Sequence, residues 1–482
     1  MKRIILTTGG TGGHIFPALA VAEELRRRNP GTMLLFMGGQ YGQEADLAAN
    51  SGLDFVGLPV RGILGRGLKG IWAGLGMVRG LVKAFRVISR IKPELVVGFG
   101  GYAAFAGVLA ARIAGSPTAI HEQNAYPGMT NRLLGKVVDR VFLSLPDASG
   151  AFDTKKTVLV GNPVRAAIAE LYEKRLRETG LPRPGTDADE REEQSASGRG
   201  PGMSFYGGVD APSPFDVAGQ SGVAAASGMS GAAAPSDMSG EVARSGPPAE
   251  ADATAKAASD VKGARESAAT RSPRLLVMGG SLGARAINRT MIPAVGALRE
   301  AGIEIWHQTG ASEYESVRAA YREAGADHVR VEPFIADMQR AYAWADLVLC
   351  RAGGSSMAEI TAAGLPAILV PLPKAAQDHQ RHNARFLERE GGAVVLEQER
   401  FYSEHAGAGK TPPDVPDENG GKGDFRVLAR TIISLFQDRQ ALDLMARKSL
   451  AAARPYAARA LVDGLEALLA DNQPRRAHAQ QS

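Results

Sequence analysis

Residues 2–14 read KRIILTTGGTGGH, and this stretch decides the fold class. An apolar strand pattern over residues 2–8 runs into a glycine-rich turn, and a helical pattern follows through Leu25. Residues 274–283 read RLLVMGGSLG and repeat the arrangement. The matching glycines keep a constant offset of 270 residues: Gly9 with Gly279, Gly10 with Gly280, and Gly13 with Gly283. Strand, glycine turn and helix in this order are typical of the βαβ unit of a parallel sheet.

A second pair of segments repeats the same pattern. Leu95–Val97 leads through a glycine pair at 100–101 into a helix of small residues, and Leu347–Leu349 leads through a pair at 353–354 into another. These matched pairs predict an α/β protein with two Rossmann-like, doubly wound parallel-sheet domains that face each other across a cleft. We expect Leu95–Ala111 to form strand, turn and helix. It is rich in glycine and slightly too short to span a membrane.

The chain of 482 residues is long enough for more than one domain. Pro182–Arg274 contains no Leu, Ile or Trp, so it cannot bury enough apolar surface to offset the entropy of ordering. A shorter polar break runs from about His405 to Asp424. The sequence therefore predicts an N-terminal Rossmann-like domain over 1–176, a disordered insert over 177–272, a C-terminal Rossmann-like domain over 273–440, helices over 441–471 that pack back toward the first domain, and a disordered tail over 472–482.

The net charge of +5 is unevenly distributed. Residues 1–175 hold 22 Lys+Arg and 12 Asp+Glu, a net charge of +10, and the remainder carries −5. A basic first part favours an anionic partner: nucleic acid, a phosphorylated substrate or an acidic membrane. Aromatic residues make up only 6% of the chain, which does not favour base stacking, so we expect no nucleic-acid partner.

The glycine-rich turns are suited to binding phosphate, because backbone N–H groups and the helix dipole favour an anion there. The dinucleotide fingerprint G-x-G-x-x-G does not fit, since Ile15 stands at its last position. Gly409-Lys410-Thr411 lacks the first glycine of a P-loop, and prolines rather than a helix follow it. Asp187 and Asp189 could pair on a metal but lie in the predicted insert, and no His/Cys cluster has metal-ligand spacing. We expect no metal and no cofactor.

Polar residues follow several of the expected strands. His14 comes directly after the first glycine turn, where an imidazole suits general-base chemistry. His121-Glu122-Gln123-Asn124 ends a buried strand, so these side chains must meet each other or a ligand. The sequence does not decide whether the general base is His14 or a residue of this cluster. Glu359, inside the helix opened by Gly353-Gly354, could accept both hydroxyls of a ribose, and Arg165 could pair with a phosphate.

Five segments together resemble the successive motifs of the MurG family, the peptidoglycan N-acetylglucosaminyltransferases of glycosyltransferase family 28. These segments are 9–17 (GGTGGHIFP), 121–124 (HEQN), 161–165 (GNPVR), 279–285 (GGSLGAR) and 378–384 (DHQRHNA). The resemblance implies a GT-B fold. It also implies inverting transfer of GlcNAc from UDP-GlcNAc to the 4-hydroxyl of MurNAc in undecaprenyl-pyrophosphoryl-MurNAc-pentapeptide, which converts lipid I to lipid II.

The resemblance also implies which residues contact the donor. By motif position, these contacts fall on Thr11, Gly12, Gly13, Asn124, Arg165, Ser281, Ile335, Ser355, Ser356, Met357, Glu359 and Gln380. Ile335 resembles the backbone contact to uracil, and Glu359 the ribose clamp. The link between the domains is far longer than the family's few residues, and the break near 405–424 resembles an added insertion. Neither interrupts a motif.

Residues 55–93 contain eight basic residues and no acidic one. Arg79, Lys83, Arg86 and Arg90 are spaced as one stripe of a helix, beside an apolar face of Ile71, Leu75, Val78, Val82 and Phe85 with Trp72 near the boundary. A basic stripe next to an apolar face is typical of an interfacial helix on anionic lipid. The ordinary alternative places the apolar face in the core. With the family resemblance, the pattern predicts a peripheral protein at the cytoplasmic face of the cell membrane, with wall-synthesis and division proteins as possible partners.

Three functions remain open at this level. The first is the inverting transferase. The second is another GT-B enzyme, either a UDP-GlcNAc 2-epimerase or a different lipid glycosyltransferase. The third is a non-catalytic, membrane-bound sensor of nucleotide sugars.

Overall fold

The computed structural model describes residues 1–10, 12–61, 69–181, 271–279, 284–373, 375, 378–402 and 424–479. In 69–73 and 472–479 it describes the backbone alone. The described parts of residues 1–181 and 271–482 belong to one compact unit. Nearly all of the predicted insert over 177–272 and of the break near 405–424 lies outside the described residues.

The first sheet has seven parallel strands in the order β3-β2-β1-β4-β5-β6-β7. Their bounds are β1 (Arg3–Thr7), β2 (Met33–Gly39), β3 (Asp54–Leu58), β4 (Leu95–Gly98), β5 (Thr118–Glu122), β6 (Arg140–Leu143) and β7 (Thr157–Leu159). Ile4 pairs with Leu34 of β2 on one side and with Leu95 of β4 on the other. The strand order therefore reverses between β1 and β4, which is the topological switch point of a doubly wound sheet.

The second sheet has six parallel strands in the order β10-β9-β8-β11-β12-β13. Their bounds are β8 (Arg274–Met278), β9 (Glu304–Gln308), β10 (Arg330–Glu332), β11 (Leu347–Cys350), β12 (Ala367–Leu369) and β13 (Ala393–Val395). The switch point here lies between β8 and β11. The predicted class, α/β with two doubly wound parallel sheets, is confirmed. Leu95–Ala111 is indeed strand, turn and helix.

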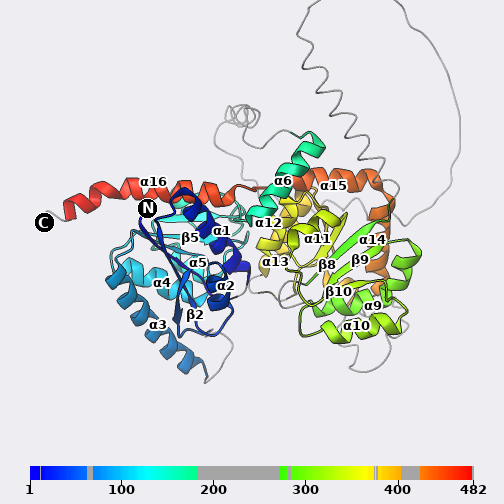
Figure 1. The fold of residues 1–482 in the computed structure, drawn as a ribbon, viewed down its shortest axis with the longest axis horizontal. Helices are drawn as coiled ribbons and strands as arrows, with labels where there is room; N and C mark the ends of the chain where they lie inside the picture. Colours follow the sequence, from blue (N-terminus) through cyan, green and yellow to red (C-terminus); the bar gives the residue numbers. More distant parts are fainter. Residues whose placement is uncertain are drawn as a thin grey trace, which may run out of the picture. The chain divides into compact units, whose positions relative to one another are not determined.

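Helices cover both sheets (Figure 1). Around the first sheet they are α1 (Gly12–Arg28), α2 (Glu44–Asn50), α3 (Lys69–Ile91), α4 (Gly101–Ile113) and α5 (Met129–Leu134), and α6 (Ala166–Thr179) follows in the chain. The later helices are α9 (Arg285–Glu300), α10 (Tyr314–Glu323), α11 (Met338–Trp344), α12 (Gly354–Ala362), α13 (His379–Arg389), α14 (Phe425–Gln437), α15 (Arg439–Ala451) and α16 (Ala457–Ala479). Single 3₁₀ turns span Thr154–Lys156 and Gln398–Arg400.

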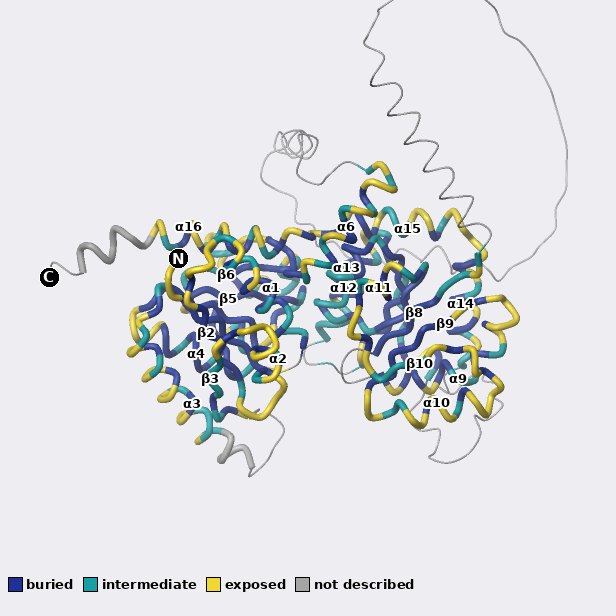
Figure 2. Tube along the Cα trace, in the orientation of Figure 1, coloured by how far each residue is buried: buried dark blue, intermediate teal, exposed yellow. Residues whose placement is uncertain are grey.

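The central strands are buried on both faces, which explains why their sequences are continuous apolar runs rather than alternating ones. Figure 2 shows the strands in the buried colour and the outer faces of the helices exposed. Leu95, Val96 and Val97 of β4 are fully buried, and so are Leu347, Val348 and Leu349 of β11. The sheets are thus rigid platforms, and the loops that follow their carboxyl ends carry the polar residues.

Two helices pack away from the sheet that precedes them in the chain. Ile168, Leu171 and Tyr172 of α6 belong to a core cluster with β8 and β11 residues. Leu461, Val462 and Leu465 of α16 belong to the core of the first sheet, with β1 and α1 residues. Arg28 at the end of α1 pairs with Asp463 and Glu466 of α16. The segment after the second sheet therefore returns to pack on the first.

None of the described helices is long and apolar enough to cross a bilayer.

Candidate functional site

The loops that follow β1 and β4 meet at the first switch point. The Gly9 N–H donates to the Gly100 carbonyl oxygen over 3.0 Å. Gly100 and Gly101 have φ angles of 98° and 81°, in the region that favours glycine. A Cβ atom on Gly101 would lie 1.9 Å from the Gly9 oxygen, so only glycine allows the two loops to approach this closely.

His14 lies in the first turn of α1, beside this meeting point. Its Nδ1 atom is 2.9 Å from Oε1 of Gln123. A Cβ atom on Gly100 would lie 3.0 Å from the imidazole, so the absence of a side chain at Gly100 makes room for the ring. No described residue bonds the other ring nitrogen, and the side chain is only partly buried. The site therefore presents one accessible imidazole nitrogen at the carboxyl end of the sheet.

His121, at the end of β5, is fully buried and has both ring nitrogens engaged. Nε2 lies 2.9 Å from the Gly161 oxygen, and Nδ1 lies 3.1 Å from Nε2 of Gln123. Burial lowers the pKa of His121 to about 4, although the hydrogen bond to Gly161 opposes this shift. A neutral, enclosed imidazole of this kind cannot serve as the base.

Glu122 holds its own loop together. Its carboxylate accepts hydrogen bonds from the backbone N–H groups of Asn124 (2.9 Å) and Gly128 (3.2 Å). It also accepts from the side-chain amides of Asn124 (3.1 Å) and Asn131 (2.8 Å). These bonds satisfy a buried carboxylate and leave it a structural role. The expectation that the side chains of 121–124 meet each other is confirmed, and of the two candidate bases the geometry favours His14.

The carboxylate of Glu359, in α12, accepts hydrogen bonds from two side chains. Arg165 approaches its Oε1 with Nη2 at 2.8 Å and Nε at 3.0 Å. The Tyr342 hydroxyl donates to its Oε2 over 3.1 Å. Burial and the neighbouring carboxylate raise the pKa of Tyr342 well above its ordinary value, so the phenol stays protonated. Two predicted donor-binding residues thus pair directly.

The start of α12 touches residues of the first sheet's loops. The Ser355 hydroxyl donates to the Gly13 oxygen over 2.8 Å and accepts from the Asn162 amide over 3.3 Å. A Cβ atom on Gly354 would lie 2.3 Å from the Gln123 oxygen. The two glycine-opened helices, α1 and α12, are therefore brought together at their N-terminal ends.

Asn383 and Tyr342 are further polar residues of this region that the sequence analysis did not single out. Asn383 is fully buried in α13. Its amide donates to Asn124 Oδ1 and to the Ala352 oxygen over 3.0 Å each, and its Oδ1 accepts from the Ala125 N–H over 2.8 Å. Asn383 could have been predicted from its spacing, since it lies one helical turn after Gln380 and therefore on the same face of the helix. Tyr342 gave no signal, because an aromatic residue at helical spacing is usually part of a core.

The remaining predicted donor contacts are distributed as follows. Ile335 is buried, and its N–H donates to Gln308 Oε1 over 3.0 Å. Met357 is buried, whereas Ser356 is partly exposed. Gln380 accepts from the Leu372 N–H over 3.0 Å. Thr11 and Ser281 lie outside the described residues.

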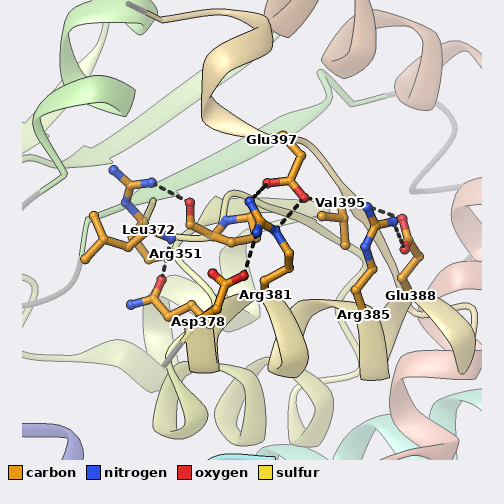
Figure 3. A network of polar contacts seen from close by, with 10 residues as sticks. Arg351, Leu372, Asp378, Arg381, Arg385, Glu388, Val395 and Glu397 are labelled. Carbon is orange, nitrogen blue, oxygen red and sulfur yellow. Dashed lines mark hydrogen bonds and ion pairs between the residues drawn. The ribbon is translucent and has the colours of Figure 1, made fainter. Parts of the chain in front are cut away.

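A polar network fixes the start of α13 near Gln380 (Figure 3). Asp378 precedes the helix with a φ angle of 55°, unusual for a residue other than glycine. Figure 3 shows Arg381 between the carboxylates of Asp378 and Glu397. Its Nε atom lies 3.1 Å from Glu397 Oε1. The hydrogen bond to Glu397 raises the pKa of Arg381. In the described part of the chain no group of three or more His, Cys, Asp or Glu could hold a metal ion.

Sequence comparison assigns the chain to a family. The glycosyltransferase family 28 N-terminal domain matches residues 4–143, and the C-terminal domain of the same family matches residues 274–405. A Nitratidesulfovibrio vulgaris protein is 47% identical over 469 residues, which cover 97% of this chain and 98% of that one. Its name is UDP-N-acetylglucosamine–N-acetylmuramyl-(pentapeptide) pyrophosphoryl-undecaprenol N-acetylglucosamine transferase. The chain belongs to this family of glycosyltransferases.

Structural comparison agrees. The crystal structure of MurG from Acinetobacter baumannii matches with a TM-score of 0.58 at 26% identity, covering 97% of this chain and 99% of that one. The predicted GT-B fold is thereby confirmed. A UDP-GlcNAc 2-epimerase from Neisseria meningitidis matches with a TM-score of 0.54 at 12% identity over 96% of this chain and 99% of that one. At this identity the likeness shows a shared fold and nothing about activity.

Proposed function

We propose that the chain transfers GlcNAc from UDP-GlcNAc to the 4-hydroxyl of MurNAc in undecaprenyl-pyrophosphoryl-MurNAc-pentapeptide, with inversion at the anomeric carbon. Membership of the family supports the substrates. The observation that carries the mechanism is the accessible nitrogen of His14 beside the paired N-termini of α1 and α12. A direct displacement needs this combination of a base and an anion-stabilising terminus.

In the proposed step, His14 Nε2 takes the proton of the 4-hydroxyl as that oxygen attacks the anomeric carbon. The bond from this carbon to the diphosphate oxygen breaks on the opposite face, and its electron pair leaves with UDP. The developing charge on the diphosphate is stabilised by the backbone N–H groups at the start of α12. Protein-held metal is not required in this scheme.

For the donor, we propose a partner exchange at Glu359. When UDP binds, the Glu359 carboxylate accepts the ribose hydroxyls and Arg165 turns to the diphosphate. The remaining donor contacts are Thr11, Gly12, Gly13, Asn124, Ser281, Ile335, Ser355, Ser356, Met357 and Gln380. Residues 273–440 would then carry the donor site, and residues 1–176 the acceptor and membrane side.

For the membrane, we propose that α3 lies on an anionic lipid surface at the cytoplasmic face, where nucleotide sugars are available. Leu75, Val78, Val82 and Phe85 are exposed by 40–58%, although apolar. The core contact of α3 is made instead by a different face, which includes Ala84 and Ile88. Arg79, Lys83, Arg86 and Arg90 are exposed beside the apolar residues. Trp72 belongs to the first turns of α3, where side chains are not described.

The reaction is tested by incubating the protein with UDP-GlcNAc and a short-chain analogue of the lipid acceptor. A lipid-linked disaccharide together with UDP is the expected product. Formation of UDP-ManNAc would indicate an epimerase instead, and binding without turnover would indicate a sensor.

A further inference from the structure

A continuous chain of hydrogen bonds leads from the buried interior to His14. It begins at the Gly161 carbonyl oxygen, which lies 2.9 Å from His121 Nε2. It continues from His121 Nδ1 to the Gln123 amide nitrogen over 3.1 Å, and from Gln123 Oε1 to His14 Nδ1 over 2.9 Å. The Gln123 amide nitrogen also donates to the Phe99 carbonyl oxygen over 3.0 Å. Two backbone carbonyls thus terminate the chain, and a carbonyl can only accept.

The first carbonyl determines the tautomer of His121. Because Gly161 can only accept, His121 must carry a hydrogen on Nε2. The ring is neutral, since burial lowers the pKa of His121 to about 4. His121 Nδ1 is therefore a lone-pair acceptor.

The second carbonyl determines the orientation of Gln123. The end of its amide that faces Phe99 and His121 meets three acceptors: the Phe99 oxygen, His121 Nδ1 and, over 3.3 Å, the His121 carbonyl oxygen. This end must therefore be the NH₂ group, which alone has hydrogens to donate. The reverse orientation would place an oxygen against a carbonyl oxygen and a lone pair, and Gln123 is only 2% exposed, so water could not relieve the repulsion. Gln123 Oε1 must consequently face His14, and it can only accept.

We propose that Gln123 is a positioning residue that holds the hydrogen of neutral His14 on Nδ1 and leaves the lone pair on Nε2. A free histidine favours the opposite tautomer, with hydrogen on Nε2, which could not take a proton at that atom. Gln123 would thus act like the third residue of a catalytic triad, which orients the imidazole and fixes its tautomer in other enzymes. Its catalytic consequence rests on the proposed role of His14 as base, whereas the tautomer itself can be measured without turnover.

The tautomer is tested by nitrogen NMR of the full chain labelled with ¹⁵N-histidine, at a pH where His14 is neutral. The His14 signals are identified by their absence from His14→Ala. We expect a pyrrole-like Nδ1 and a pyridine-like Nε2. A pyrrole-like Nε2 would overturn the proposal, whatever the activity of the protein.

The positioning role is tested with Gln123→Met, which has a similar size but no acceptor. We expect kcat to fall ~10- to 100-fold, as for other residues that orient a functional imidazole, with KM for UDP-GlcNAc nearly unchanged. Gln123→Met also removes the acceptor that holds the hydrogen on His14 Nδ1. The nitrogen NMR spectrum of this variant should therefore lose the pyrrole-like Nδ1 signal of His14, which a merely structural role of Gln123 would not predict.

Thr290→Val is the control for a general loss of stability, since it removes a buried hydrogen bond of α9 to the Ala286 oxygen, away from the site. It should leave kcat unchanged. Unchanged kcat in Gln123→Met, or a loss of kcat in that variant while His14 keeps a pyrrole-like Nδ1, would overturn the positioning role. If Gln123→Met does not fold, the NMR measurement on the wild-type protein decides.

Discussion

At the residue scale, two charged residues proposed to bind the donor pair with each other. Arg165 and Glu359 are 194 positions apart in sequence and form an ion pair whose Glu359 side chain is only 13% exposed. A partly buried carboxylate needs such a partner, because desolvation would otherwise be costly. The same pairing keeps both groups close to where a nucleoside diphosphate would need them.

Glu359→Ala should weaken binding of UDP and of UDP-GlcNAc alike. A lost charge-assisted hydrogen bond corresponds to roughly 1.5–3 kcal/mol, or about a 10- to 150-fold higher Kd. Calorimetry with UDP is the measurement. Glu388→Ala, which removes a carboxylate paired with Arg385 on α13, is the matched control and should bind normally. An unchanged Kd for Glu359→Ala would remove this residue from the ribose site.

At the element scale, α3 differs from an ordinary amphipathic helix because its basic stripe and its exposed apolar residues lie next to each other. Lys83 also donates to the Gly57 oxygen over 2.7 Å, which ties the helix to the end of β3. The glycines of this segment do not prevent the helix. A Cβ on Gly80 would lie 2.4 Å from Val60, so this glycine permits close packing instead.

Changing Lys83, Arg86 and Arg90 together to Glu should reduce binding to vesicles that contain anionic lipid, because each basic residue contributes about 1 kcal/mol near such a surface. Donor binding should not change. The matched control changes Arg299, Arg318 and Arg322, exposed residues of α9 and α10, to Glu. Equal sedimentation of both triple variants with vesicles would contradict the membrane role of α3.

The sequence was most informative where geometry is local. The glycine turns at 9–13 and 353–354 predicted where strands end and helices begin. Gly10 has a φ angle of 110°, and a Cβ atom on Gly354 would lie 2.3 Å from the Gln123 oxygen, so both positions favour glycine. The side chains of 121–124 were expected to meet each other or a ligand, and within this segment His121 contacts Gln123 and Glu122 contacts Asn124. The pairing of Arg165 with Glu359 and the roles of Tyr342 and Asn383 could not be predicted. Such contacts join segments far apart in the chain and depend on how the helices pack.

At the scale of the whole molecule, each sheet contains one histidine that is buried and neutral. Burial lowers the pKa of His121 to about 4 and that of His307 to about 3. His307 bonds Tyr321 at 2.9 Å and Asn288 at 3.0 Å, which links β9 to α9 and α10. A folded pKa below the unfolded value of about 6.5 means that the unfolded chain binds more protons between these values.

The free energy of unfolding should therefore be highest above about pH 6.5. It should decrease as the pH falls from there toward the folded pKa values of His121, about 4, and His307, about 3. The loss at pH 5 is about 2 kcal/mol for each histidine. Urea unfolding between pH 7 and 5 measures it. In His307→Gln the free energy of unfolding should decrease less between pH 7 and 5, by about 2 kcal/mol, because only one of the two buried histidines remains. An identical pH dependence in wild type and variant would contradict the assignment.

The long segment between the two sheets offers a second test at this scale. Deleting Thr186–Thr270 should leave transferase activity intact, because the segment has no Leu or Ile with which to build a core. Shortening the link to about ten residues lowers the entropic cost of closing the loop, as a free energy, by roughly 2 kcal/mol. The free energy of unfolding should therefore not fall. Loss of transfer in a deletion variant whose sheets still unfold cooperatively would show that the segment has a function of its own.

Inverting transfer with His14 as the base is tested by steady-state formation of the lipid-linked disaccharide by the wild type, His14→Ala and His328→Ala. His328 is an exposed histidine between α10 and β10 and serves as the control. We expect a β-linked product from wild type and His328→Ala. In His14→Ala we expect kcat to be lower by about 10²–10⁴-fold, with KM for UDP-GlcNAc nearly unchanged. Near-native turnover by His14→Ala, or a product that retains the donor's anomeric configuration, would contradict this mechanism.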